Sequence, residues 1–231
     1  MQKRGLQAIL FDMDGTLIDT IKDIQFAING ALASQSVMPI SEEQTKQVVG
    51  RGLINALKGA LSLQAKQLDE QSFARMYQLM IDLYHEHPCD YSHPYEGIEA
   101  FLERLISAGL VLGILSNKED VLTQQIVKKI FPHIDFSWVC GMKLDEPKKP
   151  DKHGVVKFCT SEGLCLGEVL YVGDSEVDYY TAQNAGCPVF LVSWGFRKKE
   201  DLHALDDAVI VDSVDELEEA IYAIQREGSE K

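Results

Sequence analysis

The stretch LQAILFDMDGTLIDT, Leu6–Thr20, decides the fold. Its apolar run Ala8–Phe11 predicts a buried strand, and the strand ends in two aspartates, Asp12 and Asp14, one residue apart. Carboxylates at a strand end repel one another and lose hydration energy, so something must compensate them. A solvated surface turn would explain DMDG if the motif stood alone. The other candidates are a metal ion and a set of lysines.

Further apolar runs predict the rest of a sheet. Five of them follow, most with helical patterns between them: Val111–Leu115, Trp138–Cys140, Val169–Val172, Val189–Val192 and Val209–Val211. Strands that alternate with helices and are apolar throughout predict an α/β fold, with a Rossmann-like parallel sheet covered on both faces. Ligands bind such sheets at the carboxyl ends of the strands. Polar residues follow three of the strands, so we expect them at one edge: Asp12, Asp14, Ser116, Asn117, Asp174 and Asp178.

Apolar residues are spaced differently in the segment between the first two strands. From about residue 21 to residue 87 the apolar residues recur at helical spacing, and SEEQ at residues 41–44 is typical of a capping box. Roughly 70 residues are far more than a crossover helix needs. We therefore expect two domains: an inserted all-helical cap domain at residues 19–92, and an α/β core domain at residues 1–18 and 93–231.

Charge and composition exclude several classes of partner. The net charge of −14 argues against nucleic acid and against anionic membrane surfaces, because both require a basic face. No window approaches the ~18 to 20 consecutive apolar residues of a membrane span. An acidic protein can still bind a small phosphorylated metabolite if the positive charge is local or comes from a divalent cation. The sequence does not determine the oligomeric state.

The N-terminus and the cysteines both predict a cytoplasmic protein. The basic start MQKR resembles a signal peptide, but the apolar run after it covers only residues 8–11 before two acids follow. The five cysteines are an odd number, scattered without CxxC spacing. Such cysteines are typical of reduced thiols rather than of a disulfide framework.

Four carboxylates at the strand ends of one sheet predict a metal site. Asp174 and Asp178 follow the apolar strand of VLYVGDSEVD, as Asp12 and Asp14 follow the first strand. These acids would repel one another strongly unless a divalent ion lay among them, and oxygen ligands of this kind suit Mg²⁺. A lysine in PKKP, Lys149, could neutralise charge on a transferring phosphoryl group, although a lysine pair alone is more typical of a solvated surface.

Taken in order, these motifs resemble those of a known family. DMDGT, SN, KKP and GDSEVD, from residue 12 to residue 178, are similar to the four motifs of the haloacid dehalogenase-like phosphatases. The helical insertion after the first motif resembles the cap of that superfamily. VVGRG at residues 48–52, PYEG at 94–97 and NAGCPVFLVSWGF at 184–196 resemble the phosphoglycolate phosphatase branch.

The resemblance implies the chemistry of three residues. Asp12 would be the nucleophile that takes the phosphoryl group and becomes an aspartyl phosphate. Asp14 would protonate the leaving alcohol and then deprotonate the attacking water. Lys149 would steady Asp12 and the developing charge. Two close carboxylates can divide the work in this way if their environments separate their protonation states.

The resemblance also implies the binding residues. The phosphoryl oxygens and the rest of the substrate would contact Thr16, Ser116 and Asn117. The Mg²⁺ ligands would be Asp12, the backbone carbonyl of Asp14, and Asp174. Asp178 would either bind the ion directly or contact it indirectly, behind Asp174. Dehalogenases of the superfamily lack a second acid at the position of Asp14, so this residue favours a phosphatase.

Several alternatives stay open at this point. Within the superfamily, a sugar-phosphate mutase uses the same intermediate, and a pyrophosphatase is also compatible with the motifs. Outside it, a receiver-like signalling module also surrounds a phosphorylatable aspartate with acids, a Ser or Thr and a lysine. Arg51 departs from the uncharged residue expected in phosphoglycolate phosphatases. Its guanidinium could pair with an anionic group of the substrate, or it could simply face solvent.

Overall fold

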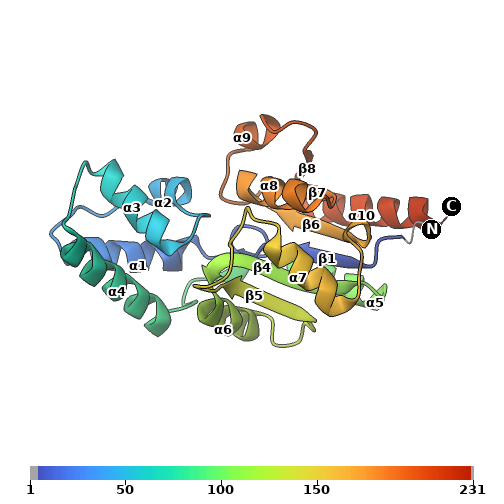
Figure 1. The fold of residues 1–231 in the computed structure, drawn as a ribbon, viewed down its shortest axis with the longest axis horizontal. Helices are drawn as coiled ribbons and strands as arrows, with labels where there is room; N and C mark the ends of the chain where they lie inside the picture. The colour runs from blue at the N-terminus through green and yellow to red at the C-terminus, as the bar shows by residue number, and fades with distance from the viewer. Residues whose placement is uncertain (1–4, 230–231) are drawn as a thin grey trace.

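A six-stranded parallel sheet forms the centre of the protein in this computed structural model, which describes residues 5–229 (Figure 1). The strand order is β5-β4-β1-β6-β7-β8, and every neighbouring pair is parallel. The first strand is therefore central, with β4 on one side and β6 on the other. The strands are β1 (Ala8–Phe11), β4 (Val111–Glu119), β5 (Trp138–Met142), β6 (Val169–Gly173), β7 (Val189–Val192) and β8 (Val209–Val211).

The predicted α/β class and parallel sheet are confirmed, and three strands run further than predicted. β4 shows the largest difference, because it ends at Glu119 rather than at Leu115. Its pairing with β5 is regular up to Leu115, then shifts in register before Glu119 pairs with Met142. The polar residues that seemed to end this strand instead belong to an irregular extension at the carboxyl edge of the sheet.

Helices cover both faces of the sheet. Side chains of β1 alternate between the faces: Ile9 and Phe11 join one apolar cluster, and Ala8 and Leu10 join another. The first face is covered by α5 (Ile98–Ser107), α6 (Asp120–Ile130) and α10 (Val214–Ser229). The second is covered by α7 (His153–Glu162), α8 (Glu176–Ala185) and α9 (Lys199–His203), with a 3₁₀ turn, η1 (Leu166–Glu168), before β6. Among the described residues, no helix is long and apolar enough to cross a membrane.

Four helices lie together beside the sheet, at the left of Figure 1. They are α1 (Ile21–Ala33), α2 (Glu42–Val48), α3 (Leu53–Leu63) and α4 (Glu70–Glu86), here called the helical segment. Its apolar side chains form one cluster, which Leu122 and Phe196 of the core also join. The chain enters and leaves the segment through β2 (Ile18–Asp19) and β3 (His93–Pro94), which pair antiparallel. This arrangement is consistent with the predicted cap. The predicted boundaries stay a prediction, and their outer ends at residues 1–4 and 230–231 lie outside the described residues.

Local sequence signals explain where these helices begin. The predicted capping box is confirmed at the start of α2, where Ser41 Oγ accepts from Gln44 N at 3.2 Å. Gln44 Oε1 in turn accepts from Ser41 N at 2.8 Å. This reciprocal pair satisfies two of the backbone N–H groups that a helix start leaves without partners.

A buried carboxylate ties the two connections of the helical segment together. Asp23, in the first turn of α1, is 1% exposed. Its oxygens accept from the backbone N–H groups of Asp90 and Tyr91 at 3.1 Å and from the hydroxyl of Ser92. The chain that returns towards β3 is therefore held against the helix that left β2.

We expect Asp23→Ala to lower the free energy of unfolding by about 3 kcal/mol, because it leaves several donors without an acceptor. Urea denaturation would measure the change. Asp23→Asn, which keeps acceptor oxygen, should lose less. Glu70→Ala is the matched control, since Glu70 is exposed at the start of α4 and should change stability by no more than about 0.5 kcal/mol. Equal stability of the Asp23→Ala variant and the wild type would contradict this account.

Candidate active site

The predicted acids meet at the carboxyl edge of the sheet, where the helical segment faces it. The register aligns Phe11 with Ile114 on one side and with Val172 on the other, so the residues just after these three aligned positions converge. Six of the predicted residues line one cavity of about 40 Å³: Asp12, Asp14, Ser116, Asn117, Lys149 and Asp174. The wall contributed by the helical segment is apolar and consists mainly of Ile24, Val49, Leu53 and Ala56.

Lys149 bridges two buried carboxylates. Its Nζ lies 2.8 Å from Asp12 Oδ1 and 2.7 Å from Asp178 Oδ1, and its side chain is 3% exposed. Burial disfavours the ammonium, but Asp12 and Asp178 outweigh burial and raise the pKa of Lys149 well above its ordinary value. Burial raises the pKa of Asp12, and the charges of Asp178 and Asp174 raise it further against the opposing effect of Lys149. One lysine thus cannot compensate all of the acids.

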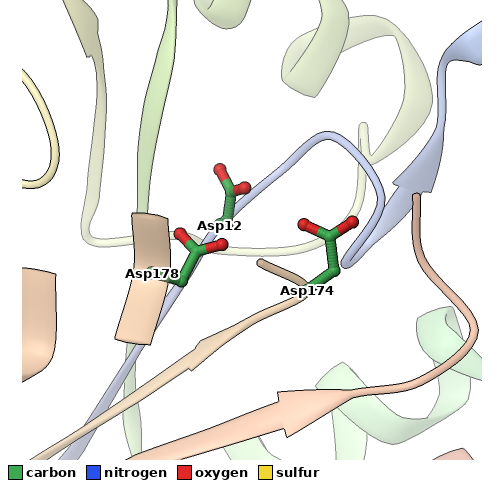
Figure 2. Close-up of side chains that lie close together, drawn as sticks. All are labelled: Asp12, Asp174 and Asp178. Carbon is green, nitrogen blue, oxygen red and sulfur yellow. The ribbon is translucent and has the colours of Figure 1, made fainter. Parts of the chain in front are cut away.

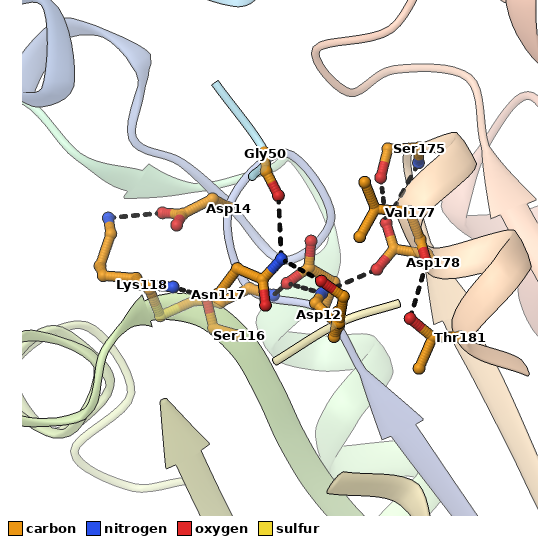
Figure 3. Close-up of polar contacts among 12 residues, drawn as sticks. Asp12, Asp14, Gly50, Ser116, Asn117, Lys118, Ser175, Val177, Asp178 and Thr181 are labelled. Atoms are coloured by element: carbon orange, nitrogen blue, oxygen red, sulfur yellow. Dashed lines mark hydrogen bonds and ion pairs between the residues drawn. The ribbon is translucent and has the colours of Figure 1, made fainter. Parts of the chain in front are cut away.

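Asp178 has a donor on each oxygen. Oδ1 accepts from Lys149 and from the hydroxyl of Tyr171 at 3.2 Å. Oδ2 accepts from the backbone N–H of Ser175 at 3.2 Å and from its hydroxyl at 2.6 Å, in a capping box at the start of α8 (Figure 3). Asp178 does not line the cavity. The arrangement makes it a support for Lys149.

Asp174 sits in a pocket that two glycines leave open. Its Oδ2 accepts from Phe196 N at 2.6 Å. A Cβ on Gly15 would lie 2.3 Å from that oxygen, and a Cβ on Gly195 would lie 2.4 Å from it. Gly15 also has a φ of +84°, which favours glycine. Burial, together with the charge of Asp178, raises the pKa of Asp174 to about 7.

The donor set fits a hard divalent cation. Asp12, Asp174 and Asp178 each offer a carboxylate oxygen, and these atoms lie within 4.8 Å of one another (Figure 2). No hydrogen bond from a described residue reaches Asp12 Oδ2 or Asp174 Oδ1. Burial raises the pKa values of Asp12 and Asp174, and the charges of neighbouring acids raise them further. Carboxylate oxygens in such a cluster suit Mg²⁺, with Asp12 and Asp174 better placed as ligands than Asp178.

Sequence reasoning missed the partners of Asp14. Lys118 Nζ lies 2.7 Å from Asp14 Oδ1 (Figure 3). The hydroxyl of Thr20 donates to the same oxygen at 2.6 Å. The Lys118 side chain is 2% exposed and also contacts the hydroxyl of Tyr84, on α4. The available signal was a lysine directly after the SN motif, in a strand that is otherwise buried. Its link to the helical segment had no signal in the sequence.

Ser116 and Asn117 line the cavity, but their side chains already make hydrogen bonds to other parts of the protein. The side-chain amide of Asn117 donates to the carbonyls of Gly50 at 3.2 Å and Lys149 at 3.1 Å. The hydroxyl of Ser116 accepts from Lys118 N at 3.1 Å and keeps its own proton available. The predicted contacts of both residues with a phosphoryl group stay a prediction. The amide of Asn117 holds the start of the Gly50 loop against the core.

Thr16 does not line this cavity. It is fully buried, and its hydroxyl has no hydrogen-bond partner within residues 5–229. Its carbonyl accepts from Trp194 Nε1 at 3.1 Å, so the residue helps to hold the turn after β1. Its predicted contact with a substrate stays a prediction.

Arg51 lies in an outer cleft rather than in the inner cavity. Its side chain is 67% exposed, and Nη2 pairs with Glu176 Oε1 at 3.1 Å. Arg197, which the sequence did not single out, lines both spaces and pairs with Glu176 Oε2 at 2.9 Å. It also donates to the carbonyls of Lys46 and Val49, at 2.8 Å each. Arg197 thus connects the end of α2 to the core.

Comparison with known proteins identifies the family. A family model described as haloacid dehalogenase-like hydrolase matches residues 9–192, so the chain belongs to that family. A phosphoglycolate phosphatase of Vibrio parahaemolyticus is 30% identical, covering 96% of this chain and 98% of its own. An N-acetylmuramic acid 6-phosphate phosphatase of Pseudomonas aeruginosa is 31% identical, covering 94% of this chain and 95% of its own.

A solved structure supports the same assignment. A crystal structure from Lactobacillus delbrueckii subsp. bulgaricus, provisionally described as a phosphoglycolate phosphatase, superposes with a TM-score of 0.88 at 29% identity. The match covers 94% of this chain and 98% of the other. The predicted resemblance to the phosphoglycolate phosphatase-like branch is confirmed. Membership of a hydrolase family argues against the receiver-like signalling module.

The raised pKa of Asp174 predicts how Mg²⁺ stabilises the protein. An unfolded aspartate has a pKa near 4, so between about pH 4 and pH 7 the Asp174 carboxyl binds a larger share of a proton in the folded chain than in the unfolded chain. The contribution of Asp174 to the stability of the metal-free protein therefore falls as the pH rises through this window. A bound cation removes this penalty. We expect the rise in Tm on adding Mg²⁺ to a chelator-treated sample to be larger at pH 8 than at pH 5.5.

Asp174→Asn is the diagnostic variant. It should raise the Tm of the metal-free protein at pH 8 and lose most of the Mg²⁺ effect. Asp145→Asn is the matched control, because Asp145 is exposed, lines neither the cavity nor the outer cleft, and should behave as the wild type. A Mg²⁺ effect of the same size at both pH values, kept in the Asp174→Asn variant, would rule out this site.

Proposed function

We propose that this protein is a Mg²⁺-dependent phosphatase that hydrolyses a small, phosphoglycolate-like phosphomonoester through an aspartyl phosphate on Asp12. One observation carries the proposal. The Asp12 carboxylate is buried in the cavity, 2.8 Å from the Lys149 ammonium, within a cluster of acids that suits a divalent cation. The family membership and the named phosphatases among the relatives support it.

In the first half of the reaction, a carboxylate oxygen of Asp12 attacks phosphorus and the bond to the ester oxygen breaks. Asp14 gives its proton to the departing oxygen, which leaves as a neutral alcohol. Lys149 holds Asp12 in place and supplies positive charge beside the transferring group. Mg²⁺, held by Asp12, Asp174 and the carbonyl of Asp14, would supply the further positive charge that phosphoryl transfer needs.

In the second half, water attacks the phosphorus of the aspartyl phosphate, and Asp14 takes a proton from that water. The bond between phosphorus and Asp12 breaks, which regenerates the carboxylate and releases inorganic phosphate. The apolar wall of Ile24, Leu53 and Ala56 excludes other water from the reacting atoms. Asp178 takes no direct part and keeps Lys149 oriented.

The size of the cavity favours a small substrate. A volume of about 40 Å³ holds about three water-sized groups, which is close to the size of a phosphoryl group alone. A longer substrate would have to extend into the outer cleft, where Arg51 could pair with a second anionic group. The cytoplasmic location belongs to the same proposal and is supported by five cysteines that are all free thiols.

Phosphate release from a panel of phosphate esters and pyrophosphate tests the proposal. The panel comprises 2-phosphoglycolate, glycerol 3-phosphate, glucose 6-phosphate, N-acetylmuramic acid 6-phosphate, AMP and pyrophosphate, each with Mg²⁺ and with excess chelator. We expect Mg²⁺-dependent turnover, highest for a small monoester, and inhibition by Ca²⁺, which binds at longer distances and seats the reacting groups loosely. Asp12→Asn should lower kcat at least about a thousandfold, because its amide is not a nucleophile, while the fold is kept.

The same panel separates the alternatives. Preference for pyrophosphate, or isomerisation of a hexose phosphate without phosphate release, would favour the pyrophosphatase or the mutase. Folded Asp12→Asn protein with near wild-type turnover would contradict the mechanism.

Arg51→Ala should raise KM, relative to the wild type, only for esters with a distant anionic group. A change in KM of the same size for every ester, or no change for any, would remove Arg51 from the substrate site.

A further inference from the structure

We propose that Lys118 is a positioning residue, which fixes Asp14 so that its Oδ2 atom faces the leaving group. The inference rests on the proposed function, because it assigns a task to the acid that protonates the departing oxygen. Lys118 belongs to none of the motifs that the sequence pointed to. Its contacts join Asp14, the core and the helical segment.

The hydrogen bonds of Asp14 distinguish its two oxygens. Oδ1 accepts from Lys118 Nζ at 2.7 Å and from Thr20 Oγ1 at 2.6 Å. In the described part of the chain, no residue donates a hydrogen bond to Oδ2. Two donors therefore hold Oδ1 in place, and Oδ2 is the oxygen of Asp14 that is left without a donor from the described residues. The side chain is 19% exposed, and Asp14 lines the cavity.

Lys118 is itself held from three sides. Its backbone N–H donates to Ser116 Oγ at 3.1 Å, at the carboxyl end of β4. Its ammonium contacts the hydroxyl of Tyr84 and lies 4.7 Å from the centre of that ring. Tyr84 is fully buried on α4. Burying an ammonium costs free energy unless an anion pairs with it, and Asp14 is the carboxylate that pairs with Lys118. Moving either side chain away from the other would therefore cost free energy.

This geometry has a chemical consequence that depends on the leaving group. When the bond between phosphorus and an alkyl oxygen breaks, the oxygen needs a proton, and Asp14 Oδ2 must lie within hydrogen-bond reach to supply it. The anion of 4-nitrophenol is stable without a proton at neutral pH. Loss of the correct Asp14 orientation should therefore slow the cleavage of alkyl phosphates and leave the cleavage of the nitrophenyl ester nearly unchanged.

The experiment measures kcat/KM for Lys118→Met with three substrates: 2-phosphoglycolate, glycerol 3-phosphate and 4-nitrophenyl phosphate. This parameter reports the steps up to release of the first alcohol and is not limited by the second half of the reaction. Methionine keeps an unbranched four-atom stem, with sulfur in place of one methylene group, and lacks the ammonium. Lys128→Met is the matched control, because Lys128 is exposed on α6 and should match the wild type with all three esters.

We expect Lys118→Met to lower kcat/KM about a hundredfold for both alkyl phosphates and no more than about fivefold for 4-nitrophenyl phosphate. Equal losses on all three esters would overturn the proposal and leave Lys118 a general electrostatic or structural residue. A loss confined to 2-phosphoglycolate would also overturn it, since Lys118 would then bind the carboxylate of the substrate. Wild-type protein that hydrolyses none of the esters would refute the proposed function instead.

A second variant keeps the test decisive if Lys118→Met does not fold, as judged by circular dichroism and thermal unfolding. Tyr84→Phe keeps the ring over the ammonium but removes the hydroxyl partner of Lys118. We expect it to lower kcat/KM about tenfold for the alkyl phosphates and to leave the nitrophenyl ester unchanged. The same kcat/KM ratio between alkyl and aryl esters as in the wild type would overturn the proposal.

Discussion

The contact of the Lys149 ammonium with Asp12 and Asp178 is the interaction on which the rest of the site depends. Three carboxylates lie buried at the carboxyl edge of the sheet, and one lysine cannot balance them. Asp178 is satisfied by its other donors, so the uncompensated charge falls on Asp12 and Asp174. A fold that buries such a cluster is stable with a cation in place and strained without one. In the proposed mechanism, the need for a cation and the reactivity of Asp12 therefore have the same cause.

The helical segment adds the other half of the active site. The loop after α2 is held to the core by polar contacts from several elements: Asn117 donates to the carbonyl of Gly50, and Lys148 Nζ donates to the carbonyl of Arg51. Arg197 binds two further carbonyls at the end of α2. The inner wall of the segment is apolar, so the cavity is charged where phosphate would lie and apolar where the leaving group would lie. Such a division is consistent with the small ester of the proposed function.

The sequence predicted those features that depend on short-range patterns. Buried strands, the helical insertion, the capping box at Ser41 and the acids after β1 and β6 all have local signals, and the parallel sheet brings the acids together. Contacts between the helical segment and the core have no local signal. Arg197 and Tyr84 acquire their partners only when the segment packs against the core, and Arg51 proved to lie in the outer cleft for the same reason.

The covalent intermediate is the central claim, and direct trapping tests it best. Protein mixed with substrate and Mg²⁺ is quenched in acid and reduced with borohydride, which converts an acyl phosphate of aspartate into homoserine, and the peptides are then mapped by mass spectrometry. The account predicts reduction at Asp12 alone, dependent on substrate and absent from the Asp12→Asn variant. A phosphoryl group found on any other residue, or reduction at Asp14 instead of Asp12, would contradict it.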